Sequence, residues 1–433
     1  MSAEATRERP LATKTCSRCG GEFGCLQGQS GCWCEAVELT RATLAELRAS
    51  ADDCLCPSCL EEFAERDRRL TEAQVRRQRG WAKALPHPAV RARGVSPLWA
   101  AAAALFVLAV LVFSLANGPL SIGVGAIAAS ALSHLPLVHV QSGLNALESA
   151  IVWQVRAPRV VLGALVGGML AVAGSAYQGV FRNPLADPYL LGVAAGAGLG
   201  ATLAISYAAA AERAGELLPL AAFAGAVCAV AGAYVLGRSV GGARTTGTLI
   251  LAGVTVAAFM TAVQTFVQQQ HSQTLQAVYS WLLGGFAGAS WHQVLLMSPY
   301  VVVSSTVILL HRRVLDVLSL GDEEAASLGL NVRRTRLLIV AAATAGTAAA
   351  VAVSGLIGFV GIIVPHTIRL LVSSSYRAIV PLSLLAGAGF LVLADVLART
   401  VLSPDELPIG VVTAFFGAPF FAVVLRTTRR VGM

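Results

Sequence analysis

The chain has 433 residues, of which 56% are hydrophobic and 13% charged, and its formal net charge is +8. One soluble core does not need this much apolar sequence, so most of the chain must face lipid; a soluble globular class is excluded and no nucleic-acid partner is expected. Residues 1–97 hold 15 of the 32 Lys+Arg and 13 of the 24 Asp+Glu. A polar N-terminal body therefore precedes a membrane body.

The N-terminal segment 1–62 contains eight of the nine cysteines. The first long apolar run begins only near Leu98 and no secretory signal precedes it, so we expect the segment to stay in the cytoplasm. Reducing conditions disfavour disulfides there, and metal ligation is the better interpretation. The expected ligands are Cys16, Cys19, Cys25, Cys32, Cys34, Cys54, Cys56 and Cys59.

Eight thiolates fill two four-sulfur zinc sites, or one cluster that shares ligands. Zinc is the first choice, because closed sulfur sites fold small domains that lack a large core. An iron–sulfur cluster is the second alternative, although the usual spacing is missing, and catalytic thiols are the third. With Cys32-Trp33-Cys34 near its middle, the stretch 14–62 resembles a small bacterial cysteine-rich family named for its Cys-Trp-Cys core.

Residues 63–97 form a charged, basic linker between the two bodies. We expect a short polar helix followed by a proline-containing connection to the first apolar run. Arginines such as Arg76, Arg77 and Arg79 suit anionic lipid headgroups, or they are only a solvated positive flank. Membrane lipid is thus an expected partner of this segment.

The remaining residues, 98–433, predict an all-α membrane domain. A spanning helix needs about 20 mostly apolar residues, and we find ten candidate spans. They lie near 98–116, 159–180, 190–209, 218–237, 246–267, 292–311, 337–355, 357–372, 378–396 and 408–425. Small residues recur in Gly163-x-x-x-Gly167 and Gly192-x-x-x-Gly196-x-x-x-Gly200, which predicts close helix packing.

The orientation of the spans follows from the arginines between them. With a cytoplasmic N-terminus, ten spans place 13 of the 17 arginines after residue 97 inside and four outside. Cytoplasmic loops of membrane proteins are enriched in Lys and Arg. We therefore expect both termini in the cytoplasm.

Several chemistries are disfavoured by what the membrane part lacks. It has no Gly-x-x-x-x-Gly-Lys-Ser/Thr phosphate loop and no acid/base pair, so the chain is not expected to be an enzyme or to hydrolyse ATP itself. The spans hold few ionisable residues, whereas an ion-coupled carrier usually keeps a carboxylate there. Asp395 is the closest candidate, but Arg399 follows one helical turn later and is a simpler partner.

A series of ordered motifs covers residues 98–430. They are Arg156-Ala-Pro-Arg159, Gly174-x-x-x-Gln178, Asn183-Pro-Leu-Ala-Asp-Pro188, Leu320 to Gly329, Gly355 to His366, Glu406 to Ala414 and Gly417-Ala-Pro-Phe420. In this order the motifs resemble the iron-siderophore and cobalamin permease family of ABC importers.

The resemblance implies a bacterial inner-membrane permease subunit that carries an iron-siderophore, haem or cobalamin. It also implies a homodimer, two separate ATPase subunits and a periplasmic or extracellular substrate-binding protein. Two other classes stay open: an ion-coupled secondary carrier, and a membrane-anchored metal or redox sensor whose spans only hold the cysteine domain.

Two groups of site residues follow from the resemblance. The loop 315–335 contains a short helix stopped by glycine, and the family uses this stretch to couple to the ATPase. The coupling residues are Leu320, Gly321, Asp322, Glu323, Glu324, Ala325, Ala326, Ser327, Leu328 and Gly329. In the resembled family, arginines at the motif positions of Arg156, Arg159 and Arg399 receive glutamates of the binding protein, so these three are the expected docking residues.

Overall fold

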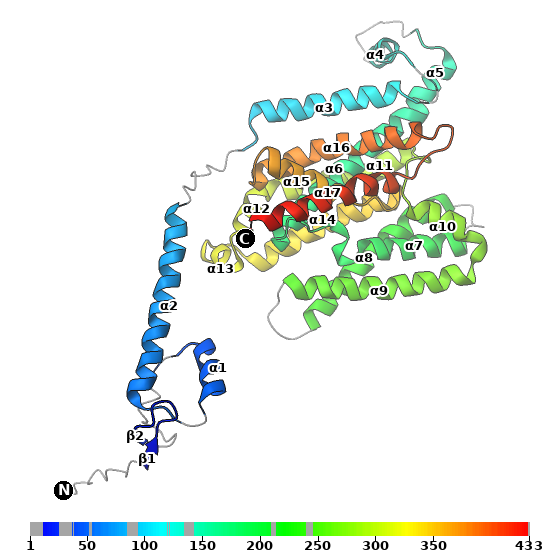
Figure 1. Ribbon diagram of the computed structural model, residues 1–433. Helices are drawn as coiled ribbons and strands as arrows, with labels where there is room; N and C mark the ends of the chain where they lie inside the picture. The colour runs from blue at the N-terminus through cyan, green and yellow to red at the C-terminus, as the bar shows by residue number, and fades with distance from the viewer. Residues whose placement is uncertain are drawn as a thin grey trace, which may run out of the picture. The chain divides into compact units, whose positions relative to one another are not determined.

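The computed structural model describes residues 12–25, 37, 39–51, 54–84, 94–118, 120, 122–133, 143–208, 214–239 and 246–431. The chain divides into two compact units, Met1–Arg91 and Ala92–Met433, as Figure 1 shows. The division falls inside the segment 63–97 that the sequence marks as a linker.

The N-terminal unit contains a small hairpin and two helices. Strands β1 (Ala12–Thr15) and β2 (Glu22–Cys25) pair antiparallel. Helix α1 (Arg41–Ser50) follows Thr40, whose side chain caps it by accepting the Thr43 N–H. Helix α2 (Pro57–Ala84) begins with proline, which suits a first turn because its missing N–H has no partner to lose there.

Asp67 of α2 fixes the start of α1. Its carboxylate accepts the Thr40 N–H at 2.8 Å and the Thr43 hydroxyl at 2.5 Å. These two hydrogen bonds, the Thr43 bond first, lower the pKa of Asp67. The unit is thus held by a few specific contacts around a small core.

The second unit is helical, and each predicted span coincides with a helix. The helices are α3 (Pro97–Ala116), α6 (Ala157–Phe181), α7 (Val193–Ala208), α8 (Ala214–Ser239), α9 (Thr246–Gln270), α11 (Trp291–Leu310), α14 (Val332–Ser354), α15 (Val360–Leu371), α16 (Tyr376–Thr400) and α17 (Ile409–Val431). Within the described residues, seven stretches are long and apolar enough to cross a membrane, while α7, α15 and the described part of α17, Ile409–Val424, are shorter. The all-α membrane class is confirmed, and the count of ten crossings stays a prediction.

The sequence did not predict several short helices. These are α4 (Val124–Ser133), α5 (Ala146–Ala150), α10 (Leu275–Leu282) and the short turns Pro188–Leu191 and Ser272–Thr274. A search for runs of about 20 apolar residues passes over elements of this length.

The second predicted span also starts earlier than expected, because α5 continues through a π-helical segment, Ile151–Arg156, into α6. Pro158 has no N–H for the carbonyl of Gln154, and its ring crowds that carbonyl. A wide π turn relieves the crowding.

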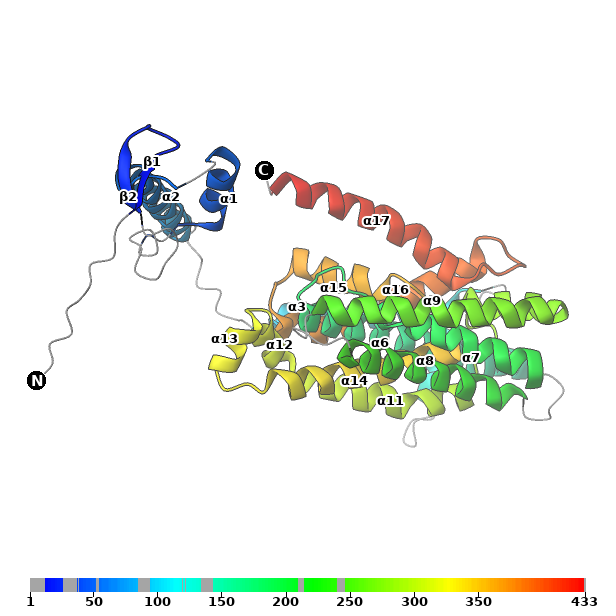
Figure 2. The same cartoon turned by 90° about the horizontal axis from the view of Figure 1, so that it is seen from below.

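Helix α6 lies at the centre of the bundle, among α11, α14, α15 and α16, and α7, α8 and α9 form a second group beside it (Figures 1 and 2). Backbones meet where glycines face each other. A Cβ on Gly174 would lie 2.0 Å from the Gly361 carbonyl oxygen, and one on Gly196 would lie 2.2 Å from that of Gly225. The close helix packing predicted from the small residues is confirmed.

Candidate functional site

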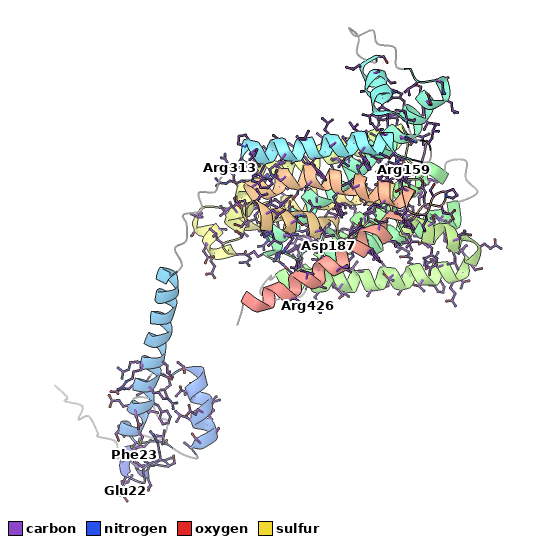
Figure 3. The ribbon with its side chains drawn as sticks, turned by 45° about the horizontal axis from the view of Figure 1, so that its top comes forward. Glu22, Phe23, Arg159, Asp187, Arg313 and Arg426 are labelled. Atoms are coloured by element: carbon purple, nitrogen blue, oxygen red, sulfur yellow. The ribbon has the colours of Figure 1, made fainter. Side chains whose placement is uncertain are left out.

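Three arginines gather at one end of the bundle, where Figure 3 labels Arg159. We call this the arginine end. At the start of α6, Arg159 forms ion pairs with Asp395 and Glu406, both at 2.8 Å. Asp395 is also 3.3 Å from Arg399, one turn later in α16. The expected pairing of Asp395 with Arg399 is therefore present, but Asp395 is shared with Arg159.

The other contacts of these arginines close the end of α3. Arg399 donates to the carbonyls of Ser114 and Asn117, both at 2.6 Å. Arg156 donates to the carbonyls of Leu115 at 2.8 Å, of Ala116 at 3.3 Å and of Leu120. The last carbonyls of a helix have no partner within it and carry partial negative charge. Here the guanidinium groups of Arg156 and Arg399 donate hydrogen bonds to the carbonyls at the end of α3.

The arginine end carries excess positive charge in its interior. Three guanidinium groups, those of Arg156, Arg159 and Arg399, face two carboxylates, and Arg156 and Arg399 are each only 5% exposed. In the described part of the chain, Arg156 has no carboxylate within ion-pair distance. The three arginines singled out by the sequence are brought together, although each is already bonded within the chain. Glu406 and the α3 carbonyls were not foreseen as their partners.

The predicted coupling loop lies at the opposite end of the bundle, which Figure 3 marks by Arg313. It includes the end of α12 (Arg312–Leu318) and the whole of α13 (Asp322–Ser327). Gly321 and Gly329, on either side of α13, have positive φ of 147° and 84°. Because glycine tolerates this backbone region best, it stops the helix where the sequence predicted a stop.

Two aspartates attach the coupling loop to the bundle. Asp316 accepts the Ser375 hydroxyl at 2.7 Å and the Tyr376 N–H at 2.6 Å, at the start of α16. Asp322 lies 2.8 Å from Arg336 of α14 and 3.5 Å from Arg182.

The outer face of the coupling loop stays open. Leu320 and Leu328 are 66% and 67% exposed, beside the exposed Glu323 and Glu324. A fixed element with an apolar and acidic face suits contact with another protein. The sequence named this loop correctly as a short helix but did not reveal its anchors, Arg182, Arg336 and Asp316.

Four cysteines of the N-terminal unit form a compact group of ligand atoms. The sulfur atoms of Cys16, Cys19, Cys56 and Cys59 all lie within 4.8 Å of one another. One pair comes from the turn after β1 and the other from the start of α2, so the two Cys-x-x-Cys segments face each other. Four thiols in such a group fit a tetrahedral sulfur site.

Hydrogen bonds favour the thiolate form of Cys16 and Cys56 but disfavour that of Cys59. The N–H of Cys56 donates to the Cys16 sulfur at 3.3 Å, and this bond is the main cause that lowers the pKa of Cys16 to about 6. Mainly the Ser58 hydroxyl lowers the pKa of Cys56, whereas the Cys56 thiol raises the pKa of Cys59 to about 12. Thiolates are the form that binds metal.

The other predicted ligands are only partly described. The sulfur atoms of Cys25 and Cys54 lie 3.9 Å apart and form a further pair beside the group of four. Cys32 and Cys34 lie outside the described residues. The choice between two sites and one shared cluster therefore stays a prediction.

Comparisons with known proteins match each unit separately. The FecCD transport family matches residues 94–427, and the Cysteine-rich CWC family matches residues 16–61. The cobalamin import system permease protein of Halobacterium salinarum is 39% identical over 358 residues, which cover 76% of this chain and 95% of the relative. The Fe(3+)-citrate import system permease protein YfmD of Bacillus subtilis is 36% identical over 325 residues, 75% of this chain and 95% of the relative.

A third relative and a solved structure agree with these matches. The hemin transport system permease protein of Yersinia pestis is 38% identical over 274 residues, with 62% of this chain and 81% of the relative covered. A solved inward-facing metal-chelate type ABC transporter superposes with a TM-score of 0.66 at 29% identity, covering 77% of this chain and 100% of that one.

Proposed function

The chain belongs to the FecCD transport family, and on that premise we propose that it imports an iron-siderophore, haem or cobalamin across the bacterial inner membrane. It is a multi-pass membrane permease of the ABC importer type and is not itself an enzyme. The match over residues 94–427 carries the proposal. The proposed partners are a second copy of the chain, two ATPase subunits and a soluble substrate-binding protein.

The cargo is proposed only as a class. The names of the three relatives refer to cobalamin, ferric citrate and hemin, which are all metal complexes of organic ligands. Uptake of each labelled compound into vesicles that contain the permease, its ATPase and its binding protein tests the proposal. ATP-dependent uptake of one of them is expected. Uptake driven by an ion gradient without the ATPase would favour the secondary-carrier alternative instead.

We propose that the coupling loop docks on the ATPase. Its anchoring by Asp316 and Asp322 and its exposed Leu320 and Leu328 support this role. Inserting two glycines after Ser327 breaks the rigid connection. ATP hydrolysis is then expected to continue while the substrate imported per ATP falls.

A matched insertion after Gly288 controls for loop length, because a Cβ on Gly288 meets no atom within 4 Å. Normal import per ATP in the Ser327 insertion variant, with the bundle still folded, contradicts the coupling role.

We propose that the arginine end receives the binding protein. Arg156 carries a buried charge with no carboxylate beside it in the described residues, so an acidic side chain of a partner finds unbalanced positive charge there. Charge pairs of this kind steer association and weaken in salt. Replacing Arg156 and Arg159 with glutamate reverses the charge but also breaks the Arg159 bonds to Asp395 and Glu406.

Arg156→Gln keeps the Arg159 ion pairs but loses the hydrogen bonds of Arg156 to the end of α3, so its thermal unfolding is compared with that of the parent. Asp405→Asn is an exposed control at the same end. Affinity for the binding protein is expected to fall about tenfold at low salt, the range of a partly buried charge pair, and the loss should shrink at high salt. Equal affinity of the folded variant and the parent at low salt removes the docking proposal.

We propose that the cysteines of the N-terminal unit hold zinc. The four-thiol group supports one ion, and the Cys25–Cys54 pair supports a second. Elemental analysis of the purified chain is expected to find zinc, and a metal-free folded unit contradicts the proposal. Two ions per chain fit two separate sites or one cluster that shares ligands, whereas one ion per chain means that only one four-sulfur site is filled.

The N-terminal unit is proposed to regulate transport and not to perform it. The Halobacterium salinarum relative aligns over 95% of its own length with 76% of this chain, and the family match begins only at residue 94. Deleting residues 1–91 is expected to leave ATP-driven uptake in vesicles. Retained uptake counts against the sensor alternative, and loss of all uptake in a deletion variant that still folds contradicts a purely regulatory role.

A further inference from the structure

A half-open groove of about 830 Å³ lies between α8 and α14, near the coupling loop. The two helices pack side by side, as Figure 2 shows. Most of the lining is apolar. Helix α8 contributes Val227, Val230 and Ala231, and α14 contributes Leu337 and Val340, so both walls follow the three-and-four spacing of a helix face.

The groove is about as long as one leaflet of a bilayer. Its α14 wall runs from Val332 to Ala345, which is about 20 Å at the helical rise of 1.5 Å per residue. One leaflet contributes half of a hydrocarbon core about 30 Å thick, or about 15 Å. The walls thus match the depth that an acyl chain of one leaflet occupies.

Arginines line only one end of the groove. Arg238 of α8 and Arg333 and Arg336 of α14 lie there, beside Asp322. Asp322 is engaged by Arg336 at 2.8 Å and by Arg182 at 3.5 Å. In the described part of the chain, Arg238 and Arg333 have no carboxylate within ion-pair distance, and the buried Nε of Arg336 has no hydrogen-bond partner. An anion complements this end.

We infer that the groove binds one anionic phospholipid, with its phosphate among the arginines and an acyl chain between α8 and α14. Basic pockets between membrane helices on the cytoplasmic side bind such headgroups. The arginine end of the groove lies on that side in the orientation expected from the sequence, and the inference rests on that orientation and on the proposed function. A free anion would contact only the arginines and would leave the apolar side chains of both walls uncovered, so a lipid fits the groove better. Because Asp322 and Ala326 of α13 also line the groove, the lipid contacts the coupling helix and supports its position.

The inference is tested with the purified full chain in detergent micelles. A phosphatidylglycerol with a fluorescent acyl chain serves as the probe, and unlabelled lipids compete with it. Phosphatidylglycerol is expected to displace the probe, phosphatidylcholine to displace it far more weakly, and glycerol phosphate not at all.

Three variants locate the binding site. Arg238→Gln and Arg333→Gln are each expected to weaken probe binding about fivefold, the effect of one basic residue on an anionic lipid. Ala341→Trp places a ring in the exposed groove and is expected to abolish specific binding. Arg336 is left intact because it holds Asp322.

The control variants are Arg312→Gln and Arg313→Gln, which remove charge from the same end of the bundle but outside the groove. Thermal unfolding without lipid checks that every variant is folded. Equal competition by phosphatidylcholine, competition by glycerol phosphate, or an equal loss in the control variants overturns the inference. Full probe binding to folded Ala341→Trp also overturns the inference, because the indole ring then occupies the groove and the lipid must bind elsewhere.

Discussion

Among the described residues of the N-terminal unit, one small buried cluster is formed by Cys16, Leu55, Cys56 and Cys59, whereas the bundle buries nearly the whole length of α6 among its neighbours. A small unit cannot bury enough apolar surface to balance the entropy lost on folding, so it needs a cross-link or a metal. The bundle instead gains close contact between backbones, which only small residues permit.

This difference teaches that the two units should fail under different perturbations. If the cysteines hold a metal as proposed, metal ligands decide the folding of the first unit, whereas close packing with a few buried charges decides that of the second. The following predictions test the contrast, from the largest expected effect to the smallest.

The largest effect is expected from metal removal. A zinc chelator, or the double substitution Cys16→Ser and Cys56→Ser, should unfold the N-terminal unit completely, because closed sulfur sites fold only with their metal. Limited proteolysis of the full chain should then digest residues 12–84 while 94–431 stay protected. Cys228→Ser, an exposed cysteine in α8, is the control and should change nothing. If the N-terminal unit stays protected from proteolysis in the presence of chelator, the contrast between the two units is wrong.

Within the bundle, Asp395→Asn is expected to cost about 3 kcal/mol, because removing one partner leaves buried charges uncompensated. Asp395 lies between Arg159 and Arg399 and is 2% exposed. The midpoint of unfolding in detergent measures the loss, and exposed Asp405→Asn serves as the control. If both variants unfold alike, the arginine end does not stabilise the bundle.

A smaller cost, about 2 kcal/mol, is expected for Gly174→Ala, since overpacking a tight contact strains the neighbours. The added Cβ would lie 2.0 Å from the Gly361 oxygen. Gly125→Ala in α4 meets no atom within 4 Å and is the matched control. Equal unfolding midpoints for the two variants would mean that α6 and α15 separate easily, against the packing described above.

The smallest effect concerns Asp67 and pH. Its pKa is lower in the folded unit than in the unfolded chain, because it accepts hydrogen bonds from Thr43 and Thr40. The folded state therefore binds fewer protons, and the stabilisation is present above the unfolded pKa of about 4 and is lost as pH falls through the folded pKa. Asp67→Asn should unfold more easily than the parent at neutral pH. The difference should shrink as the pH falls toward about 4, within the range in which the unit keeps its metal, and a difference that stays constant contradicts this origin.

Much of the fold was predictable because its causes are local. An apolar run such as 98–116 becomes α3 wherever the helix lies, and the acidic stretch before Gly329 becomes a short helix stopped by that glycine. The short α10 and the π turn before Pro158 were missed. The apolar run of α10 is too short to be recognised as a span, and the π turn depends on one proline within a helix.

The sequence by itself determined that the chain is a helical membrane permease with a cysteine-rich segment in front, since composition, spacing and ordered motifs are properties of neighbouring residues. Only the tertiary structure decided which charges meet. Arg159 and Asp395 are 236 positions apart, and Arg399 and Ser114 are 285 apart. It also separated the group of Cys16, Cys19, Cys56 and Cys59 from the Cys25–Cys54 pair. Such contacts depend on how whole elements pack, because no local pattern encodes the partner of a side chain that another helix supplies.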